Sequence, residues 1–220
     1  MAMLSFTEEN YLKALLHLTS EVEDKIEAGT NELAFYLGVK PATATDMLKK
    51  LKEKELIEYV KYGKISLSGE GRRKALEIVR KHRLWETFLY EKLEFTWDEV
   101  HEVAEQLEHI HSAKLVDKLD KFLGFPEFDP HGDSIPNAKG ELKQSFKKTL
   151  SEVETGTSCK MVAVKDNTAA FLRYVSQLNL GIDTSIKVLS RQDFDGSMEI
   201  MISNATIVVS QKFAENILIV

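Results

Sequence analysis

Hydrophobic and polar positions in the first third of the chain alternate in a way that predicts three helices and a β-hairpin. Apolar residues recur every three or four positions over 7–20, and shorter helical patterns follow over 31–39 and 40–55. The last two are joined by a glycine-containing turn, the spacing of a helix-turn-helix. Strict alternation then predicts short strands over 56–60 and 64–68. This order of elements is that of a winged helix.

The pattern changes twice more along the chain. Helical spacing predicts a long helix over 69–93 and two further helices over 96–111 and 112–125. Proline and glycine then mark a connector, after which β-type alternation dominates to the C-terminus, with one helix over 168–180. The expected strands are 159–165, 185–192, 198–203, 205–211 and 216–220. These segments predict a small β-barrel.

We therefore expect a mainly α protein with β structure, in four segments. A winged-helix DNA-binding domain spans 1–71, a helical domain 72–123, a connector 124–150 and a small barrel 151–220. No apolar run approaches the roughly 18 to 20 residues of a membrane span. The first residues lack a secretory-signal layout, and a single cysteine fits a reducing compartment. These features predict a cytoplasmic protein with no membrane partner.

Charge is distributed unevenly along the chain, although its formal net value is only -6. Residues 36–83 hold 13 Lys/Arg against 6 Asp/Glu, whereas residues 93–155 hold 7 against 14. A basic segment followed by an acidic one predicts a phosphate-binding surface beside a cation-binding surface.

The stretch "HEVAEQLEHIH" over 101–111 holds three histidines and four glutamates. On a helix, residues three and four apart are neighbours, so His101, Glu105, Glu108 and His109 would share one face and could bind one divalent cation. Taken alone, this stretch is more typical of a solvated polar face. Glu102 and His111 fall outside the predicted arc.

Two further groups strengthen the metal interpretation. His82 and Glu86 are four residues apart on the preceding long helix, where the alternative is a surface ion pair. The segment "DPHGD" offers Asp129 and His131, where the alternative is ordinary turn chemistry. The pattern H-E-x-x-H of zinc proteases fails, because Glu105 stands in place of the second histidine. With no nucleophile triad or P-loop spacing either, we expect no enzyme activity.

The predicted second helix of the helix-turn-helix carries small and basic residues suited to DNA. Threonine and alanine can contact phosphates or base edges, and lysines and tyrosine can contact the backbone. The candidate DNA-binding residues are Lys40, Pro41, Ala42, Thr43, Thr45, Lys49, Lys50, Tyr62 and Lys64. Such residues on an exposed helix carry no meaning alone; their position before a hairpin gives the prediction its weight.

Together these motifs resemble the diphtheria-toxin-repressor and manganese-transport-regulator family of metal-dependent transcriptional repressors. The likeness runs nearly end to end, through "TEENYLKAL", "VKPATATDMLKKL", "RKHRLWE", "HEVAEQLEHI", "DPHGDSIP" and "LNLGIDTSIKV". The resemblance implies a winged helix, a helical dimerisation domain with two metal sites, and an SH3-like, FeoA-like C-terminal domain.

The resemblance also implies a ligand set for each metal site. The main site would use Asn10, Glu105, Glu108 and His109. The adjacent site would use His82, Glu86 and His101, joined from the connector and barrel by Asp129, His131 and Asp166, while His82 fits either site. Position 10 departs from the family, where manganese regulators have Asp and iron regulators Met. Lys13 stands where one manganese subgroup has a liganding Glu.

Metal choice and partners follow as expectations. Glu105, where iron-responsive relatives have Cys, favours Mn²⁺ over Fe²⁺, with Zn²⁺ or other ions expected in vitro. The cation would fix the winged helix for binding, as a homodimer, to a palindromic double-stranded operator. The expected dimer surface comprises Leu84, Trp85, Phe88, Leu89, Leu115 and Leu119. A metal-storage or metal-delivery protein and a regulator of a non-metal effector remain alternatives.

Overall fold

A computed structural model describes residues 3–20, 25–59, 63–143 and 147–220. It divides into two compact units, each with its own core. The first unit comprises Met1–His82, Gln106–Ala113 and Pro136–Glu141, and the second comprises Arg83–Glu105, Lys114–Ile135 and Leu142–Val220. No helix in these described parts of the chain is both long enough and apolar enough to cross a membrane.

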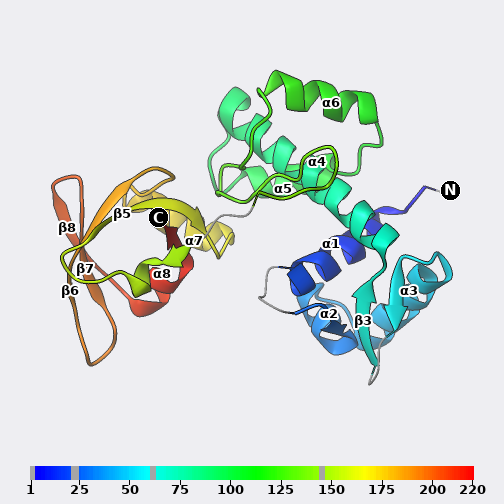
Figure 1. The fold of residues 1–220 in the computed structure, drawn as a ribbon, viewed down its shortest axis with the longest axis horizontal. Coiled ribbons are helices and arrows are strands. Elements are labelled where there is room, and N and C mark those ends of the chain that lie inside the picture. Colours follow the sequence, from blue (N-terminus) through cyan, green and yellow to red (C-terminus); the bar gives the residue numbers. More distant parts are fainter. Residues whose placement is uncertain (1–2, 21–24, 60–62, 144–146) are drawn as a thin grey trace. The chain divides into compact units, whose positions relative to one another are not determined.

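The first unit is a winged helix (Figure 1). Its helices are α1 (Phe6–Ser20), α2 (Thr30–Tyr36) and α3 (Pro41–Glu53), followed by the strands β2 (Ile57–Tyr59) and β3 (Lys64–Leu67). The sequence predicted a two-stranded hairpin, but β1 (Ala28–Gly29) pairs with β3 and makes a three-stranded antiparallel sheet in the order β1-β3-β2. Two residues are too few to show an alternation pattern, so β1 could not be predicted from the sequence.

Local sequence explains where these helices begin. Glu8 N donates to the Ser5 hydroxyl at 3.3 Å, while Ser5 N donates to the Glu8 carboxylate at 2.9 Å, a capping box that starts α1. Pro41 occupies the first turn of α3, where a missing N–H costs nothing. Ala44, Leu48 and Leu51, spaced at four and three residues, bury the inner face of α3. The outer face of α3 is thereby left to solvent.

Three helices follow the winged helix in sequence. The long helix α4 (Gly69–Leu93) has the predicted bounds and contributes residues to both units. The next, α5 (Val100–Leu107), is shorter than the predicted 96–111, and α6 (Ala113–Phe122) ends before the predicted residue 125. Glu108 and His109 therefore lie in a turn after α5 and not on its surface.

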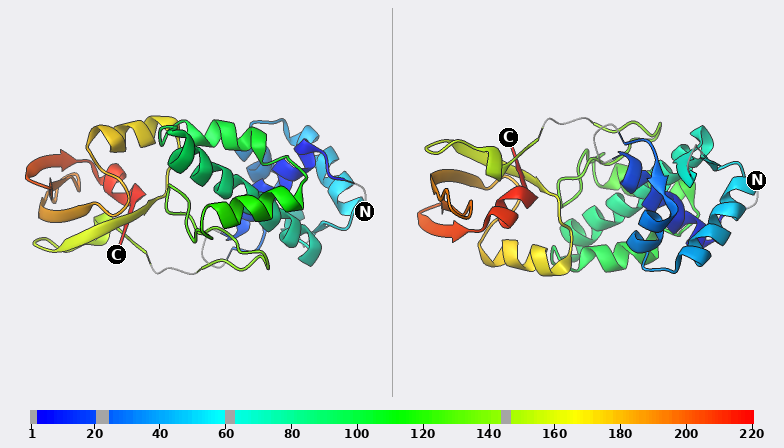
Figure 2. Two further views of the ribbon diagram at one scale, coloured as in Figure 1. Left: turned by 90° about the horizontal axis from the view of Figure 1, so that it is seen from above. Right: turned by 90° about the horizontal axis from the view of Figure 1, so that it is seen from below.

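The C-terminal part of the second unit is a six-stranded antiparallel sheet in the order β4-β9-β5-β6-β7-β8. Its strands are β4 (Lys148–Thr149), β5 (Ser158–Val164), β6 (Ser185–Arg191), β7 (Met198–Ile202), β8 (Ala205–Val209) and β9 (Ile217–Ile219). A 3-10 turn, η2 (Leu150–Glu152), and helices α7 (Ala169–Gln177) and α8 (Gln211–Asn216) accompany the sheet (Figure 2). The sequence predicted α7, while β4 and α8 were not foreseen.

The second unit buries two apolar clusters. The larger one fills the sheet, where alternating residues such as Ile186 and Val188 of β6 point inward and α7 covers them with Leu172 and Val175. Trp97, from the turn before α5, belongs to this same cluster. The smaller cluster comprises Leu84, Val116, Leu119 and Ile135. Residue 97 is thus packed with the sheet although it lies more than 60 positions before α7 in the chain.

Candidate metal centres and nucleic-acid interface

A buried glutamate forms the centre of a polar cluster in the first unit. Glu108 has a fully buried side chain, and one of its oxygens lies 2.6 Å from His82 Nδ1. Lys13 Nζ, on α1, lies 2.8 Å from both oxygens of the same carboxylate. Burial alone would raise the pKa of Glu108, but the hydrogen bond and charge of His82 and the ammonium of Lys13 lower it overall. The Glu108 carboxylate is thus ionised and held between a histidine and a cation.

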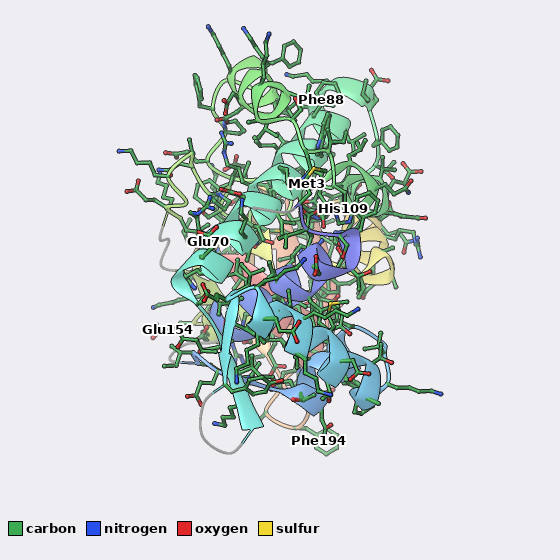
Figure 3. All side chains as sticks on the ribbon, turned by 90° about the vertical axis from the view of Figure 1, so that its right-hand side faces the viewer. Met3, Glu70, Phe88, His109, Glu154 and Phe194 are labelled. Carbon is green, nitrogen blue, oxygen red and sulfur yellow. The ribbon has the colours of Figure 1, made fainter. Side chains whose placement is uncertain are left out.

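Beside Glu108, His109 is fixed by a carboxylate that the sequence analysis did not single out. Its Nδ1 lies 2.6 Å from Glu9 Oε2, and its ring stacks on Phe6, at the beginning of α1, with centroids 4.4 Å apart. Figure 3 labels His109 beside this end of α1. With Nδ1 donating to Glu9, the lone pair of a neutral ring is on Nε2, which lies 4.0 Å from Glu108 Oε1. The Nε2 atom is therefore the one free to bind a cation together with Glu108.

Two α1 residues, Glu9 and the neighbouring Asn10, carry further polar groups. The Oδ1 atom of Asn10 is buried without a hydrogen-bond partner, which is rare and points to a missing ligand. Glu9 approaches Lys81 Nζ at 3.9 Å and His111 Nδ1 at 3.7 Å, so His111 faces the cluster although its spacing excluded it from the predicted arc. The sequence offered one signal for Glu9: it lies four residues before Lys13, on the same helical face.

The second unit brings together Glu86, Asp129 and His131. One ligand atom from each lies within 4.8 Å of the others, and all three side chains are buried. His131 Nε2 lies 3.1 Å from the Trp97 carbonyl oxygen and must donate to it. The lone pair of a neutral His131 ring is then on Nδ1, which has no hydrogen-bond partner and lies 3.7 Å from Glu86 Oε2. Carboxylates and an unpartnered imidazole nitrogen are a donor set for a divalent cation.

The electrostatics of this second cluster show an excess of negative charge. Burial, with Asp133 and Glu86 nearby, raises the pKa of Asp129 to about 8. Burial disfavours the charged form of His131, but the carboxylates of Glu86 and Asp129 outweigh it and raise the pKa of His131 to about 9. In the metal-free protein, protons therefore supply the positive charge that the cluster requires.

The loop that carries Asp129 and His131 is held rigidly. Asp129 Oδ1 accepts hydrogen bonds from the backbone N–H groups of His131 at 2.8 Å and Asp133 at 2.9 Å. Arg83 donates to the Ser134 carbonyl oxygen at 2.6 Å. Gly132 adopts a positive φ of 83°, and a Cβ added there would lie 2.0 Å from the Val162 carbonyl oxygen of β5. Only glycine allows this loop to pack so closely on the sheet.

The remaining predicted ligands are His101, Glu105 and Asp166. His101, half exposed, approaches Glu86 Oε1 at 3.2 Å through Nδ1 and Glu105 Oε1 at 3.6 Å through Nε2. Asp166 is not in the group formed by Glu86, Asp129 and His131; its carboxylate accepts a hydrogen bond from Thr168 N at the start of α7. The roles of Glu105 and Asp166 as ligands stay predictions.

The predicted DNA-binding residues occupy the outer face of the winged helix. The exposed ones are Lys40, Pro41, Ala42, Thr43, Lys49, Lys50 and Lys64. The hydroxyl of Thr45, half buried, donates to the Pro41 carbonyl oxygen at 2.9 Å within α3. Tyr62 lies outside the described residues.

The predicted dimer residues divide by burial. Leu84, Leu89 and Leu119 are buried within their own unit, where a partner chain would not reach them directly, while Trp85 and Phe88 are half buried and Leu115 is exposed. Phe88 packs edge-on against Phe122, whose side chain is 65% exposed. The accessible part of this predicted surface is therefore exposed Leu115 with half-buried Trp85 and Phe88, and Phe122 extends it on α6.

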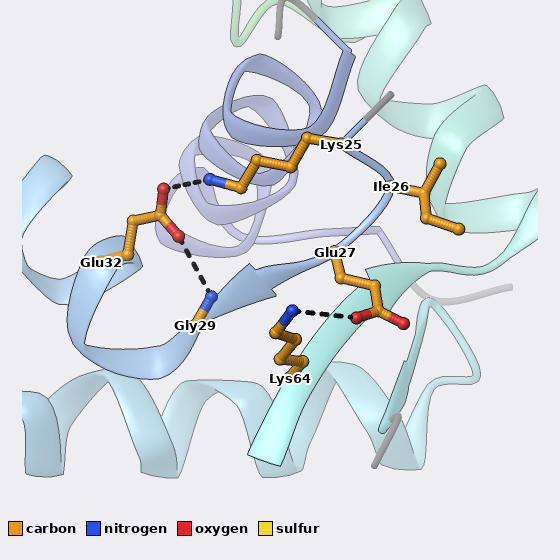
Figure 4. A pocket seen from close by; sticks show the side chains of 6 residues that line it. All are labelled: Lys25, Ile26, Glu27, Gly29, Glu32 and Lys64. Carbon is orange, nitrogen blue, oxygen red and sulfur yellow. Dashed lines mark hydrogen bonds and ion pairs between the residues drawn. The ribbon is translucent and has the colours of Figure 1, made fainter. Parts of the chain in front are cut away.

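A separate pocket in the first unit is lined by Lys25, Ile26, Glu27, Gly29, Glu32 and Lys64 (Figure 4). Its charged groups pair with one another: Lys25 bonds to Glu32, and Lys64 lies 3.6 Å from Glu27. Gly29 N also donates to Glu32. These internal pairs leave the pocket with no obvious polar feature aimed at a ligand, and it shares no residue with the two clusters.

Comparison with known proteins agrees with this arrangement of domains and ligands. Residues 3–65 match the family model "Iron dependent repressor, N-terminal DNA binding domain", and residues 68–137 match "Iron dependent repressor, metal binding and dimerisation domain". Residues 148–220 match the FeoA domain. A solved structure described as a manganese-dependent transcriptional repressor complex with manganese is 35% identical, with a TM-score of 0.85, over 97% of this chain and 99% of that one. The chain belongs to the diphtheria-toxin-repressor family.

Two curated proteins are also similar to the chain. An iron-dependent repressor of Mycobacterium leprae is 25% identical over 97% of this chain and 88% of its own length. A protein of Chlamydia trachomatis described as a probable metal transport system membrane protein is 42% identical over 71 residues, which are 32% of this chain and only 16% of that protein. The chain thus spans about a sixth of that curated relative. The diphtheria-toxin-repressor family consists of transcriptional repressors and not of enzymes, in agreement with the sequence prediction.

Proposed function

We propose that this chain is a metal-activated, DNA-binding transcriptional repressor that controls metal-ion homeostasis genes. The observation that carries the proposal is the pair of buried clusters of carboxylates and histidines, together with two buried atoms that have no hydrogen-bond partner: Asn10 Oδ1 on α1 and His131 Nδ1 in the second cluster. Buried polar atoms are normally bonded, because leaving one unpaired costs roughly 1–3 kcal/mol. A divalent cation bound in each unit would give Asn10 Oδ1 and His131 Nδ1 a partner.

Mn²⁺ suits these donors better than Fe²⁺. The proposed ligands are carboxylates, an amide oxygen and imidazole nitrogens, with no sulfur among them. Oxygen-rich sets favour harder divalent ions, whereas thiolate favours softer ones. Zn²⁺ and other ions are expected to bind in vitro, because imidazole also suits them.

The first cluster would activate DNA binding through α1. Asn10, Glu108 and His109 would hold the cation, with His82 beside them, and the cation would join a side chain of α1 to side chains of the turn after α5. Glu9 keeps His109 in the tautomer whose Nε2 is free. Fixing α1 against the turn after α5 restrains the winged helix around α3. Coupling of this kind is typically about 1 to 3 kcal/mol.

The second cluster would hold the connector loop to α4 through Glu86, Asp129 and His131, with His101 adjacent and Asp166 as a further candidate. The helix α3 would enter the major groove, with Lys40, Pro41, Ala42, Thr43 and Thr45 toward the bases. Lys49, Lys50, Tyr62 and Lys64 would contact phosphates. A homodimer would bind a palindromic operator, and its interface would include Trp85, Phe88, Leu115 and Phe122. We propose the domain limits 1–71, 72–123 and 151–220 around the connector 124–150.

Operator binding titrated with Mn²⁺ tests the proposal. Wild-type protein is expected to bind a palindromic promoter fragment only when Mn²⁺ is added, and Glu108→Ala is expected to lose this response. Lys139→Ala, an exposed lysine outside both clusters, is the matched control and should respond as wild type does. Binding that ignores both the metal and the Glu108 substitution would refute the proposal. Metal binding without any change in operator affinity would instead favour a storage or delivery protein.

A further inference from the structure

The Lys13 ammonium contacts both oxygens of the Glu108 carboxylate. Its Nζ atom is 2.8 Å from Oε1 and 2.8 Å from Oε2, so it contacts both oxygens symmetrically. The Lys13 side chain is 20% exposed, whereas that of Glu108 is fully buried. Each carboxylate oxygen has two lone pairs, and the ammonium takes one on each, so a metal ion would compete with it for the same two atoms.

This contact joins segments that are distant in sequence. Lys13 lies in the middle of α1, and Glu108 lies 95 residues later in the turn after α5. Glu9, one helical turn before Lys13, makes a second link to the same turn through His109. In the metal-free protein, α1 is thus already tied to this turn by one ammonium–carboxylate and one imidazole–carboxylate contact. The first of these uses the very atoms that a metal would need.

We propose that Lys13 is a resident counter-cation of the Glu108 site, which a metal ion must displace, and that Lys13 thereby sets the metal concentration at which the protein responds. The inference rests on the proposed function, because it assumes that Glu108 is a metal ligand. Displacement requires no proton transfer: the ammonium leaves the carboxylate and reaches solvent at the exposed side of α1. The metal-free chain keeps an α1 contact that a neutral side chain at position 13 could not make.

Charge decides the expected direction. Two like charges beside one carboxylate repel each other, and the repulsion is stronger at a buried site than in bulk water. Removing the ammonium removes both the competition for the oxygens and this repulsion. Lys13→Met keeps the apolar stem of the side chain and removes only the charge. It is expected to bind Mn²⁺ at least tenfold more tightly than the wild-type chain.

The test measures Mn²⁺ affinity directly, by electron paramagnetic resonance of the free ion, without DNA. Each chain carries Asp129→Asn so that the second cluster is weakened equally. Lys13→Arg retains the charge and is expected to bind as weakly as the parent. Lys54→Met is the matched control, because Lys54 makes a comparable 2.6 Å contact with the buried Glu8 of α1 away from the site. It should leave the affinity unchanged.

Thermal unfolding separates this role from a merely structural one. Lys13→Met should lower the melting temperature of the metal-free chain and increase the further rise that Mn²⁺ produces. Lys54→Met should lower the melting temperature by the same amount without Mn²⁺ and with Mn²⁺. Equal or weaker Mn²⁺ affinity in Lys13→Met, or tighter binding in Lys13→Arg, would overturn the inference. If Lys13→Met folds only with metal, a chelator competition on the loaded protein measures the same affinity.

The outcome also distinguishes the two proposals. If Glu108→Ala leaves the Mn²⁺ affinity of the parent chain unchanged, Glu108 is not a metal ligand, and both the Lys13 inference and the proposed function are refuted. A parent chain that needs Glu108 for Mn²⁺ affinity, with Lys13→Met unchanged, would overturn the Lys13 inference alone.

Discussion

Metal binding at the second cluster should release protons, and Asp129→Asn should reduce their number by one. The pKa of Asp129 is raised to about 8, chiefly by burial, and that of His131 to about 9, where nearby carboxylates outweigh burial. At pH 7 both groups therefore hold a proton in the metal-free chain. A cation requires an ionised carboxylate and a free nitrogen lone pair, so both protons must leave.

The magnitude follows from these pKa values. At pH 7 a group of pKa 8 is about nine-tenths protonated and one of pKa 9 almost fully, so the cluster should release about two protons per metal ion. Affinity should then rise about 100-fold per pH unit below pH 8 and level off above pH 9. The Asp129→Asn chain should release about one proton per metal ion, and its metal affinity should rise about tenfold per pH unit.

Calorimetric titration of Mn²⁺ in phosphate and in Tris measures the proton count, because the two buffers have different enthalpies of ionisation. The comparison of wild type with Asp129→Asn isolates the second cluster, since the first cluster contributes equally to both. The Glu108 carboxylate is already ionised, because its pKa is lowered. Equal proton release by the two chains would refute the reasoning.

Four further results are expected. Without metal, the raised pKa values of Asp129 and His131 stabilise the folded chain at low pH, fully so below the pKa values that these groups have in the unfolded chain. This stability is lost as the pH rises toward about 8 and 9, so chemical denaturation should give a lower free energy of unfolding at pH 9 than at pH 6. Glu9→Gln should weaken metal binding roughly 10- to 100-fold, with Glu8→Gln as control; an unchanged affinity would contradict the role of Glu9. Gly132→Ala should lower the melting temperature and the metal affinity of the second cluster, because its Cβ would collide with β5. Phe122→Ser should shift the chain toward monomer in light scattering, and an unaltered mass would argue against the α6 surface.

Hydrophobic periodicity predicted the long helix correctly but placed the end of a shorter helix wrongly. The helical period predicted α4 from Gly69 to Leu93 without error, because 25 residues of consistent spacing average out local exceptions. The same reasoning extended α5 to His111, whereas the helix ends at Leu107. Four residues are one turn of helix, too few for periodicity to separate a last turn from a loop. The wheel that grouped Glu105 with Glu108 was therefore the wrong geometry for Glu108.

The sequence by itself determined the winged helix, the helical segment and the C-terminal sheet, because their hydrophobic periods are local and repeat. It also singled out Glu86, Asp129 and His131, which the fold brings within 4.8 Å. Only the tertiary structure decided what each ligand atom faces: that Glu9 holds His109, that Trp97 orients His131, and that Lys13 binds both oxygens of Glu108. These contacts span 34 to 100 residues, and no spacing rule reaches that far. Packing of the buried cores sets which charges meet, and the meeting of those charges sets the chemistry of both clusters.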